Sequence, residues 1–377
     1  MSQNPLDKFR ATFTLKQHTP IIHFQSEQKG ATLRATELKP KLDRFLIEQF
    51  EKEGVDYISF LVSGKEKALD YKVTISPDLT NATEISDRNP LFFGNMGDGK
   101  DKRFKENNQT VKVTFFSYHT NLIKILRENF EAFLAKTNFA TRQSKGFGSF
   151  YLSKPFDKTL INHQVYSFTS SEKGWQTDIK DFYSFLRAGI NTAKFRGIYA
   201  KAVIFSYAMQ NGITWDKKAI KKHYMNNQLK RQQAEYFGAD TPVHYESNNT
   251  KIVRDLFGLS SSQSWMSYKA TVTKDDTSKE MTRFKSPIIF KPVKEGARMR
   301  IYFWANKSVE HILNKEFLIQ VNNSGDLKLQ TPSEFSFDDF FDFAFNLDLS
   351  KHISSEYHNN DQYKKLVRIF NEIKESK

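Results

Sequence analysis

Residues 94–101, GNMGDGKD, come closest to a known catalytic motif in this chain. They depart from a phosphate-binding loop, G-x-x-x-x-G-K-[ST], at the last position, where Asp101 replaces the hydroxyl that binds magnesium. Such a loop also leads directly into a helix whose N-terminus holds the phosphate. Here a charged segment and a strand pattern follow instead. We therefore expect a glycine-rich loop and no nucleotide-hydrolysing site.

Histidines are the other candidates for catalysis, because imidazole titrates near neutral pH and can act as a general acid or base. The nine histidines contain neither HExxH nor a helical i, i+4 pair, so we expect no metal site. His18, His23 and His119 are the candidates for metal-free RNA cleavage, and the alternative is loop histidines without chemistry. The absence of cysteine excludes disulfides, thiolate metal sites and cysteine nucleophiles. We expect no cofactor.

An acidic cluster near the C-terminus is interleaved with phenylalanine. Asp338, Asp339 and Asp342 lie within residues 333–345, which also contain six phenylalanines. An amphipathic helix with an acidic face explains this pattern more simply than a set of metal ligands does. Such a helix could also dock on a partner.

The basic residues indicate a polyanionic partner. The chain carries 57 Lys and Arg against 43 Asp and Glu, a net charge of +14. Between residues 194 and 231 nine cations are opposed only by Asp216, so this segment alone carries +8. Clustered cations suit phosphate contacts, and the alternative is a solvated helix face. The nine are Lys194, Arg196, Lys201, Lys217, Lys218, Lys221, Lys222, Lys230 and Arg231.

A second basic segment, residues 142–148, has the sequence RQSKGFG. Two glycines let a backbone approach a phosphate or base closely. Arg142 and Lys145 supply positive charge, while Phe147 either stacks on a base or anchors the turn. A tight helix-to-strand turn without a ligand is the alternative.

Apolar periodicity predicts the elements that position this loop. Alternation predicts four strands and helical spacing predicts two helices, in the order strand-helix-strand-strand-helix-strand. This is the order of ferredoxin-like modules, including RNA-recognition motifs. The strands are expected over residues 9–16, 70–76, 110–116 and 149–152, and the helices over 35–53 and 121–136. We expect an α+β fold in which residues 1–155 form this module.

Residues 156–377 predict a second, more elaborate α+β domain, which we interpret as another ferredoxin-like module with a helical insert at about 177–260. The longest uncharged apolar stretch, 202–215, is too short to cross a bilayer, and the start lacks a signal-peptide pattern. A cytoplasmic protein is expected. Strands are expected near 164–169, 267–273, 286–291 and 299–304, and helices over 177–210, 216–237, 308–316, 333–345 and 363–376.

Three sets of residues resemble the RAMP superfamily of CRISPR–Cas proteins. The glycine-rich loop before the last predicted strand matches R-x-S-[RK]-G-F-G-S over residues 142–149. The first strand ends at Thr19-Pro20, and a loop then leads to Arg34 and the first helix, where Pro40 replaces the usual glycine. Residues 256–258 (LFG) and 283–290 (RFKSPIIF) are similar to segments of larger members. The closest resemblance is to the subunit of type III-B (Cmr) complexes that caps the 3′ end of the guide RNA.

The resemblance implies two ferredoxin-like modules and RNA binding inside a guide-RNA effector complex, without catalysis. It implies that the start of the first helix and the glycine-rich loop face RNA, and that residues 77–109 form a thumb-like insertion. The partners implied are guide RNA, target RNA or both, and other subunits of the effector, with no membrane. The candidate RNA-binding residues are Arg34, Lys39, Lys41, Arg44, Arg142, Lys145, Gly146, Phe147, Gly148, Arg196 and Lys201.

Two alternatives stay open beside this hypothesis. The first is a metal-independent endoribonuclease that processes precursor guide RNA, with one of the three histidines as general base. The second is a structural assembly protein that contacts only other subunits through the Phe-rich helix.

Overall fold

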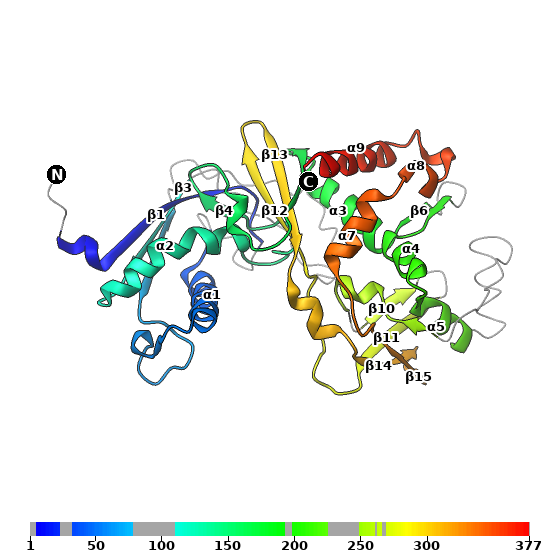
Figure 1. The fold of residues 1–377 in the computed structure, drawn as a ribbon, viewed down its shortest axis with the longest axis horizontal. Helices are drawn as coiled ribbons and strands as arrows, with labels where there is room; N and C mark the ends of the chain where they lie inside the picture. The colour runs from blue at the N-terminus through cyan, green and yellow to red at the C-terminus, as the bar shows by residue number, and fades with distance from the viewer. Residues whose placement is uncertain are drawn as a thin grey trace. The chain divides into compact units, whose positions relative to one another are not determined.

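The computed structural model describes residues 5–22, 32–77, 110–192, 198–224, 249–260, 262–265 and 269–376. The chain divides into two compact units (Figure 1). The first unit comprises residues 1–176 and 289–303, and the second comprises 177–288 and 304–377. Both contain helices and strands, so the predicted α+β class is confirmed.

The first unit begins with an antiparallel four-stranded sheet in the order β2-β3-β1-β4. Along the chain the elements follow the predicted order of strands and helices. Their bounds are β1 (Arg10–Gln17), α1 (Ala35–Glu53), β2 (Lys72–Pro77), β3 (Thr110–Phe116), α2 (Thr120–Lys136) and β4 (Phe150–Leu152). A short 3-10 helix, Pro5–Phe9, precedes β1.

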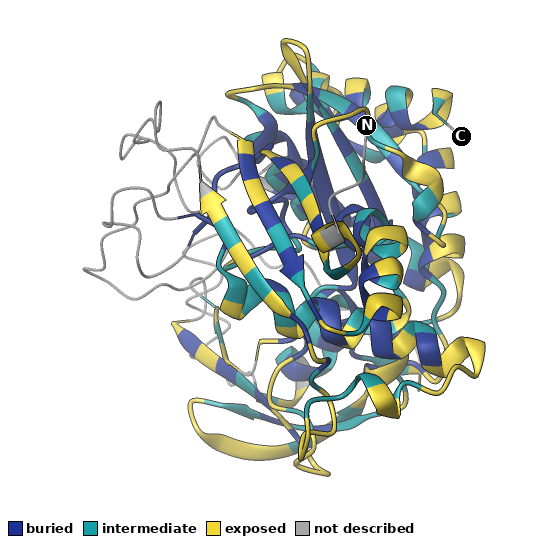
Figure 2. Ribbon diagram, turned by 90° about the vertical axis from the view of Figure 1, so that its left-hand side faces the viewer, coloured by how far each residue is buried: buried dark blue, intermediate teal, exposed yellow. Residues whose placement is uncertain are grey.

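Aromatic packing holds these helices against the sheet. Buried and exposed residues alternate along the strands, as Figure 2 shows. The Phe130 ring of α2 lies 4.6 Å from Phe13 of β1 and 4.9 Å from Phe115 of β3, between ring centroids. The abundance of phenylalanine is therefore used here to fill a core. Gly54, at a φ of +66°, ends α1 in the left-handed conformation that glycine favours.

A second sheet in this unit has the order β12-β13-β5. It joins segments that are more than 110 residues apart in the sequence, because β13 pairs antiparallel with β5 between Arg298↔Ser171 and Phe303↔Tyr166. The strands are β5 (Tyr166–Ser171), β12 (Ile288–Glu295) and β13 (Arg298–Ala305).

The second unit contains a six-stranded sheet in the order β10-β11-β14-β15-β9-β8, together with most of the remaining helices. Its strands are β8 (Thr214–Trp215), β9 (Thr250–Lys251), β10 (Ser262–Trp265), β11 (Ala270–Asp276), β14 (Glu316–Val321) and β15 (Ser324–Gln330). Its helices are α3 (Trp175–Arg187), α4 (Val203–Gln210), α5 (Asp216–Tyr224), α7 (Phe337–Asn346), α8 (Leu349–His352) and α9 (Asp361–Glu375).

Two predictions for this half of the chain are wrong in part. The helical region predicted over 177–210 is interrupted by a hairpin of β6 (Ile190–Thr192) and β7 (Ile198–Ala200), and the predicted insert also contains β8 and β9. The helix predicted over 308–316 is a 3-10 helix, Lys307–Ile312, after which β14 begins. The hairpin β14–β15 was not predicted, because β15 is polar and largely exposed and lacks an apolar alternation.

Candidate functional site

The glycine-rich loop between α2 and β4 is anchored by the Thr19-Pro20 segment. The Thr19 hydroxyl donates to the Gly146 carbonyl at 2.6 Å and accepts from the Ser149 backbone N–H at 2.9 Å. The Gly148 N–H donates to the Pro20 carbonyl at 2.8 Å. Two motifs that the sequence analysis identified separately therefore form one structure.

Gly148 is required by this packing. Its φ is +66°, and an added Cβ would lie 2.0 Å from the Phe139 carbonyl oxygen. The Gly148 carbonyl in turn accepts from the Phe139 N–H at 2.9 Å. A glycine is therefore needed at position 148 because the backbone there lies directly against the backbone of Phe139.

Phe147 and Lys145 point inward from the loop. Phe147 is 2% exposed and packs edge-on against Trp175 at 5.1 Å, so it anchors the turn. Lys145 is 9% exposed, and its Nζ lies 6.0 Å from the centre of the Phe290 ring. The Ser144 carbonyl accepts from the Phe290 N–H at 3.2 Å, which continues β12 alongside the loop.

Arg142 occupies the turn itself. Its φ is +61°, a left-handed conformation that is rare for a residue with a side chain. The side chain is half-buried, and burial lowers the pKa of the Arg142 guanidinium from its usual range. A guanidinium keeps its charge at physiological pH even so. The loop thus carries a half-buried positive charge on a residue with an unusual backbone conformation.

The first turns of α1 hold the loop from the other side. Lys41 donates to Glu37 at 2.9 Å, to the Asn138 carbonyl at 3.1 Å and to the Gln143 side-chain oxygen at 2.8 Å. Glu37 also accepts from the Ala140 N–H. Lys41, one of the predicted RNA-binding residues, is thereby committed to contacts inside the protein.

Lys39 is engaged in the same way. Its ammonium pairs with Asp43 at 2.7 Å, donates to the Leu69 carbonyl at 2.7 Å and lies 4.0 Å from the centre of the Tyr71 ring. Asp43 is 3% exposed, and burial raises its carboxyl pKa although Lys39 opposes that effect.

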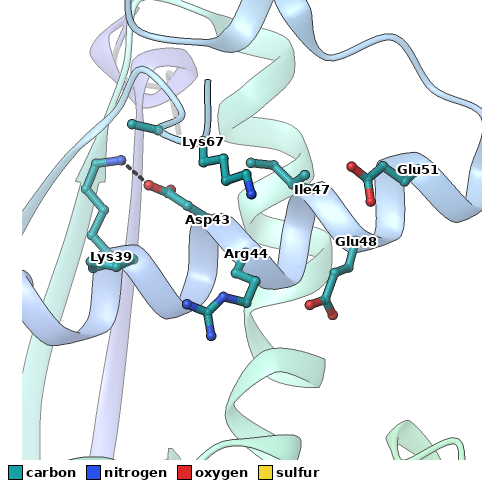
Figure 3. Close-up of a pocket in the computed structure, with 9 residues that line it drawn as sticks. Lys39, Asp43, Arg44, Ile47, Glu48, Glu51 and Lys67 are labelled. Carbon is teal, nitrogen blue, oxygen red and sulfur yellow. Dashed lines mark hydrogen bonds and ion pairs between the residues drawn. The ribbon is translucent and has the colours of Figure 1, made fainter. Parts of the chain in front are cut away.

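Arg44 is the exposed cation of this helix. In Figure 3 it extends away from the Lys39–Asp43 pair, at a pocket of about 610 Å³ on the outer face of α1. The charged groups around the pocket are three cations and three carboxylates: Lys39, Arg44, Lys67, Asp43, Glu48 and Glu51. Because these charges balance, the pocket itself does not attract a polyanion. Arg34 precedes α1 and is half-buried, and its carbonyl accepts from the Leu38 N–H at 2.9 Å.

The third pair of motif segments also meets, within the second unit. The Leu259 N–H donates to the Phe284 carbonyl at 3.0 Å, and Tyr183 donates to the Phe257 carbonyl and to Ser286. Gly258, at a φ of +127°, lets the two segments approach closely, because an added Cβ would lie 3.3 Å from the Ser286 nitrogen. The LFG and RFKSP segments therefore form one folded unit.

Both halves of the chain match one protein family. Residues 8–190 match the Cmr1 N-terminal domain, and residues 199–375 match the Cmr1 C-terminal domain. The chain belongs to the Cmr1 family. Cmr1 proteins are RAMP subunits of type III-B CRISPR effectors, so the resemblance to that superfamily and that complex is confirmed.

Among solved structures, the chain is similar to the crystal structure of Cmr1 from Pyrococcus furiosus in its apo form. The identity is 14%, the match covers 89% of this chain and 95% of that chain, and the TM-score is 0.33. A comparison with curated proteins found no match.

The histidines of this Cmr1-family chain differ in their surroundings. His18 is 7% exposed, and its Nδ1 accepts from the Lys294 N–H at 2.9 Å. Burial, with the nearby Lys291, lowers the His18 pKa to about 3, so the ring is neutral at physiological pH. His119 is partly exposed, 3.5 Å from an Asp70 carboxylate oxygen. His23 lies outside the described residues.

Metal-binding and membrane-spanning features are not found in the described part of the chain. No group of three or more His, Cys, Asp or Glu among those residues could hold a metal ion. No helix there has both the length and the apolar character needed to cross a bilayer. The segment that resembles a phosphate-binding loop and the predicted thumb beyond residue 77 lie outside the described residues.

The aromatic face of helix α7 is buried against its own unit and is therefore not available to a partner. Phe340 and Phe341 are fully buried, and Tyr207 of α4 packs edge-on against Phe340 at 5.7 Å. Phe345 packs against Phe370 of α9 at 5.7 Å. Only the acidic side of α7 is exposed, at Asp338, Asp339 and Asp342.

The predicted basic segment is described only in part. Lys194, Arg196, Lys230 and Arg231 lie outside the described residues. Lys201 is half-buried and donates to the Met209 sulfur at 3.0 Å, and burial lowers its pKa. The remaining cations belong to α5.

Several residues that fix the loop do not stand out in the sequence. Glu37 and Asn138 are the clearest examples, since Asn138 donates both to the Gln143 carbonyl and to the Phe290 carbonyl at 2.7 Å. The spacing of Glu37 and Lys41, four residues apart on a predicted helix, was the available signal.

Proposed function

We propose that this chain is a non-catalytic RNA-binding subunit of its type III-B effector, contacting guide RNA, target RNA or both in antiviral defence. The supporting observation is the joined structure of the Thr19-Pro20 segment and the glycine-rich loop, which fixes the charged Arg142 in a strained turn. A preorganised cation loses little freedom when it binds phosphate. The overall +14 charge adds long-range attraction for a polyanion, while Arg44 is an exposed side chain that can make a local contact.

The first unit supports this proposal through its architecture. The sheet order β2-β3-β1-β4 with two helical crossovers is that of a ferredoxin-like module, as in RNA-recognition motifs. In the second sheet, β12-β13-β5 repeats the order of the second, third and first strands of such a module. We therefore propose a second, incomplete ferredoxin-like module after residue 155, whose boundary stays a prediction.

The RNA contacts are assigned in this proposal to Arg142 and Arg44 first. Lys41 supports the loop by its bond to Gln143, and Lys145, Gly146, Phe147 and Gly148 give the loop its shape. Lys39 is held by Asp43 and the Leu69 carbonyl, outside the loop. Arg34, Arg196 and Lys201 stay as predicted contacts.

Binding and cleavage can be tested in one experiment. The purified chain is incubated in EDTA with a labelled single-stranded RNA carrying repeat sequence, and anisotropy and product length are both recorded. Tight, salt-sensitive binding without cleavage is the expected result. Site-specific cleavage that is lost in His119→Ala or His23→Ala would establish the endoribonuclease instead. A chain that binds no RNA would leave only a subunit-assembly role.

A further inference from the structure

A cluster of cations and indoles in the second unit has no assigned role. We call it the Lys217 cluster: Trp215, Lys217, Lys221, Arg254 and Trp265. The Lys217 ammonium lies 5.9 Å from the centre of the Trp215 ring and 5.2 Å from that of Trp265. These indoles belong to β8 and β10, which end the six-stranded sheet at opposite edges. Strands from the two opposite edges of the sheet therefore each bring an indole to within 6 Å of Lys217, next to β10 and α5 in Figure 1.

Arg254 is directed to the same face of β10. It donates to the side-chain oxygen of Gln263, two residues before Trp265, and Gln263 donates to Asp255 at 3.3 Å. Residues two apart on a strand share a face. Lys217 and Arg254 therefore approach one face of one strand, beside a half-buried indole.

The carboxylates nearest to these cations are already occupied. Lys274, 2% exposed, pairs with Asp216 at 2.5 Å and with Asp255. Neither Lys217 nor Arg254 forms an ion pair among the described residues of the chain. The cluster therefore holds excess positive charge in a partly desolvated position.

The titration of Lys217 agrees with this charge distribution. Burial and the neighbouring Lys221 and Arg254 lower the Lys217 pKa to about 8, and Asp216 only partly offsets them. An anion bound beside Lys217 would reverse the repulsion and favour its protonated form.

We propose that the Lys217 cluster binds one nucleotide of single-stranded RNA, with the phosphate between Lys217 and Arg254 and the base against Trp265. Clustered cations interleaved with aromatic rings suit a ligand that has both a negative phosphate and a flat base. A bare phosphate would contact the cations but would not stack on the indole. The proposal rests on the RNA-binding function proposed above and adds a contact site in the second unit.

The test uses the full chain and a fluorescein-labelled hexauridylate, with anisotropy and tryptophan quenching as readouts. Lys217→Met and Trp265→Leu are each expected to weaken binding about tenfold, since one stacked base or one lost cation has effects of this order. Lys218→Met makes the same charge change on α5 away from the indoles, and it is expected to have little effect. Inorganic phosphate is expected to compete only weakly.

A pH series on the wild type separates a lost RNA contact from misfolding of a variant. Wild-type affinity is expected to fall from pH 7 to pH 9 as Lys217 loses its proton, whereas Lys217→Arg retains its affinity at pH 9. If the wild type binds RNA and both Lys217→Met and Trp265→Leu bind it equally well, the Lys217 cluster is not a binding site, while the proposed function still stands. Phosphate binding without hexauridylate binding would overturn the nucleotide assignment. Failure of the wild type to bind any RNA would overturn the proposed function as well.

Discussion

The hydroxyl of Thr19 donates a 2.6 Å hydrogen bond to the carbonyl of Gly146, which lies 127 residues later in the sequence. Thr19 is fully buried, and its oxygen also accepts from the Ser149 N–H. A single side chain therefore satisfies both ends of the glycine-rich turn. The shape of the loop depends on this residue more than on the charges that the loop carries.

Thr19→Val is expected to destabilise the first unit by about 1–3 kcal/mol, because it leaves a buried carbonyl and a buried N–H without partners. It should also weaken RNA binding by loosening the loop. Urea unfolding and RNA titration measure the two effects. Thr12→Val, which removes an exposed hydroxyl bonded to Thr114 at 3.2 Å, is the control and should change neither. Equal behaviour of the two variants would contradict the anchoring role.

Gly148→Ala should be one of the most destabilising substitutions in the first unit. The added Cβ meets the Phe139 carbonyl and the backbone conformation is left-handed, so we expect a loss of about 3 kcal/mol or more. Gly54→Ala provides the matched control. Its φ is also +66° but nothing lies within 4 Å, so only the conformational cost of about 1 kcal/mol applies. Thermal unfolding of both variants separates the clash from the backbone strain, and a similar loss in both would show that no clash occurs.

Because His18 is buried in its neutral form, we expect the free energy of unfolding to decrease in acid. In the unfolded chain its pKa is near 6.5, whereas in the fold it is about 3, so below pH 6.5 only the unfolded state binds the proton. The contribution of His18 is complete above pH 6.5 and falls by about 1.4 kcal/mol per pH unit down to pH 3. We expect a loss of about 2 kcal/mol between pH 7 and pH 5.

His18→Asn keeps an acceptor for the Lys294 N–H but cannot take up the proton. Its unfolding free energy should vary less with pH than that of the wild type, while His311→Asn, at an exposed position, should follow the wild type. A wild-type slope that persists in His18→Asn would show that other groups cause it.

Lys274 is expected to be essential for the second unit. Burial raises the pKa of Asp255, but the paired Lys274 holds that pKa below its usual range, so the carboxylate is charged in the interior. Lys274→Met would remove the cation that pairs with both Asp216 and Asp255, leaving Asp255 only the more distant Arg187 at 4.0 Å, and we expect a cost of about 3–5 kcal/mol. Lys315→Met breaks the exposed pair with Glu280 and should leave the unfolding midpoint nearly unchanged. Comparable midpoints for the two variants would contradict a structural role for the buried pair.

The sequence predicted the first unit well because its core is built from regular apolar patterns. The alternation Phe9, Ala11, Phe13, Leu15 and the stripe through Phe130 and Phe133 lead directly to β1 and α2. The strands of the second unit were harder to predict, because β8 and β9 have two residues each and β15 is mainly polar. Their pairing depends on distant partners that periodicity does not reveal.

The sequence predicted which segments of the candidate site lie together better than it predicted what the individual side chains contact. The loop and the start of α1 do lie together, but Lys39 and Lys41 bond to the carbonyls of Leu69 and Asn138, which no local pattern indicates. The role of Phe147 as a core residue was equally hard to predict, because its packing partner Trp175 is 28 residues away in the sequence.

The salt dependence of RNA binding by Arg142→Gln tests the central claim most directly. Anisotropy titrations of wild type and variant with single-stranded guide RNA are compared from 50 to about 300 mM salt, with thermal unfolding as the check on folding. The account predicts weaker binding and a log–log salt slope smaller by about one, as expected when one phosphate contact is lost. A folded variant with the affinity and slope of the wild type would contradict it.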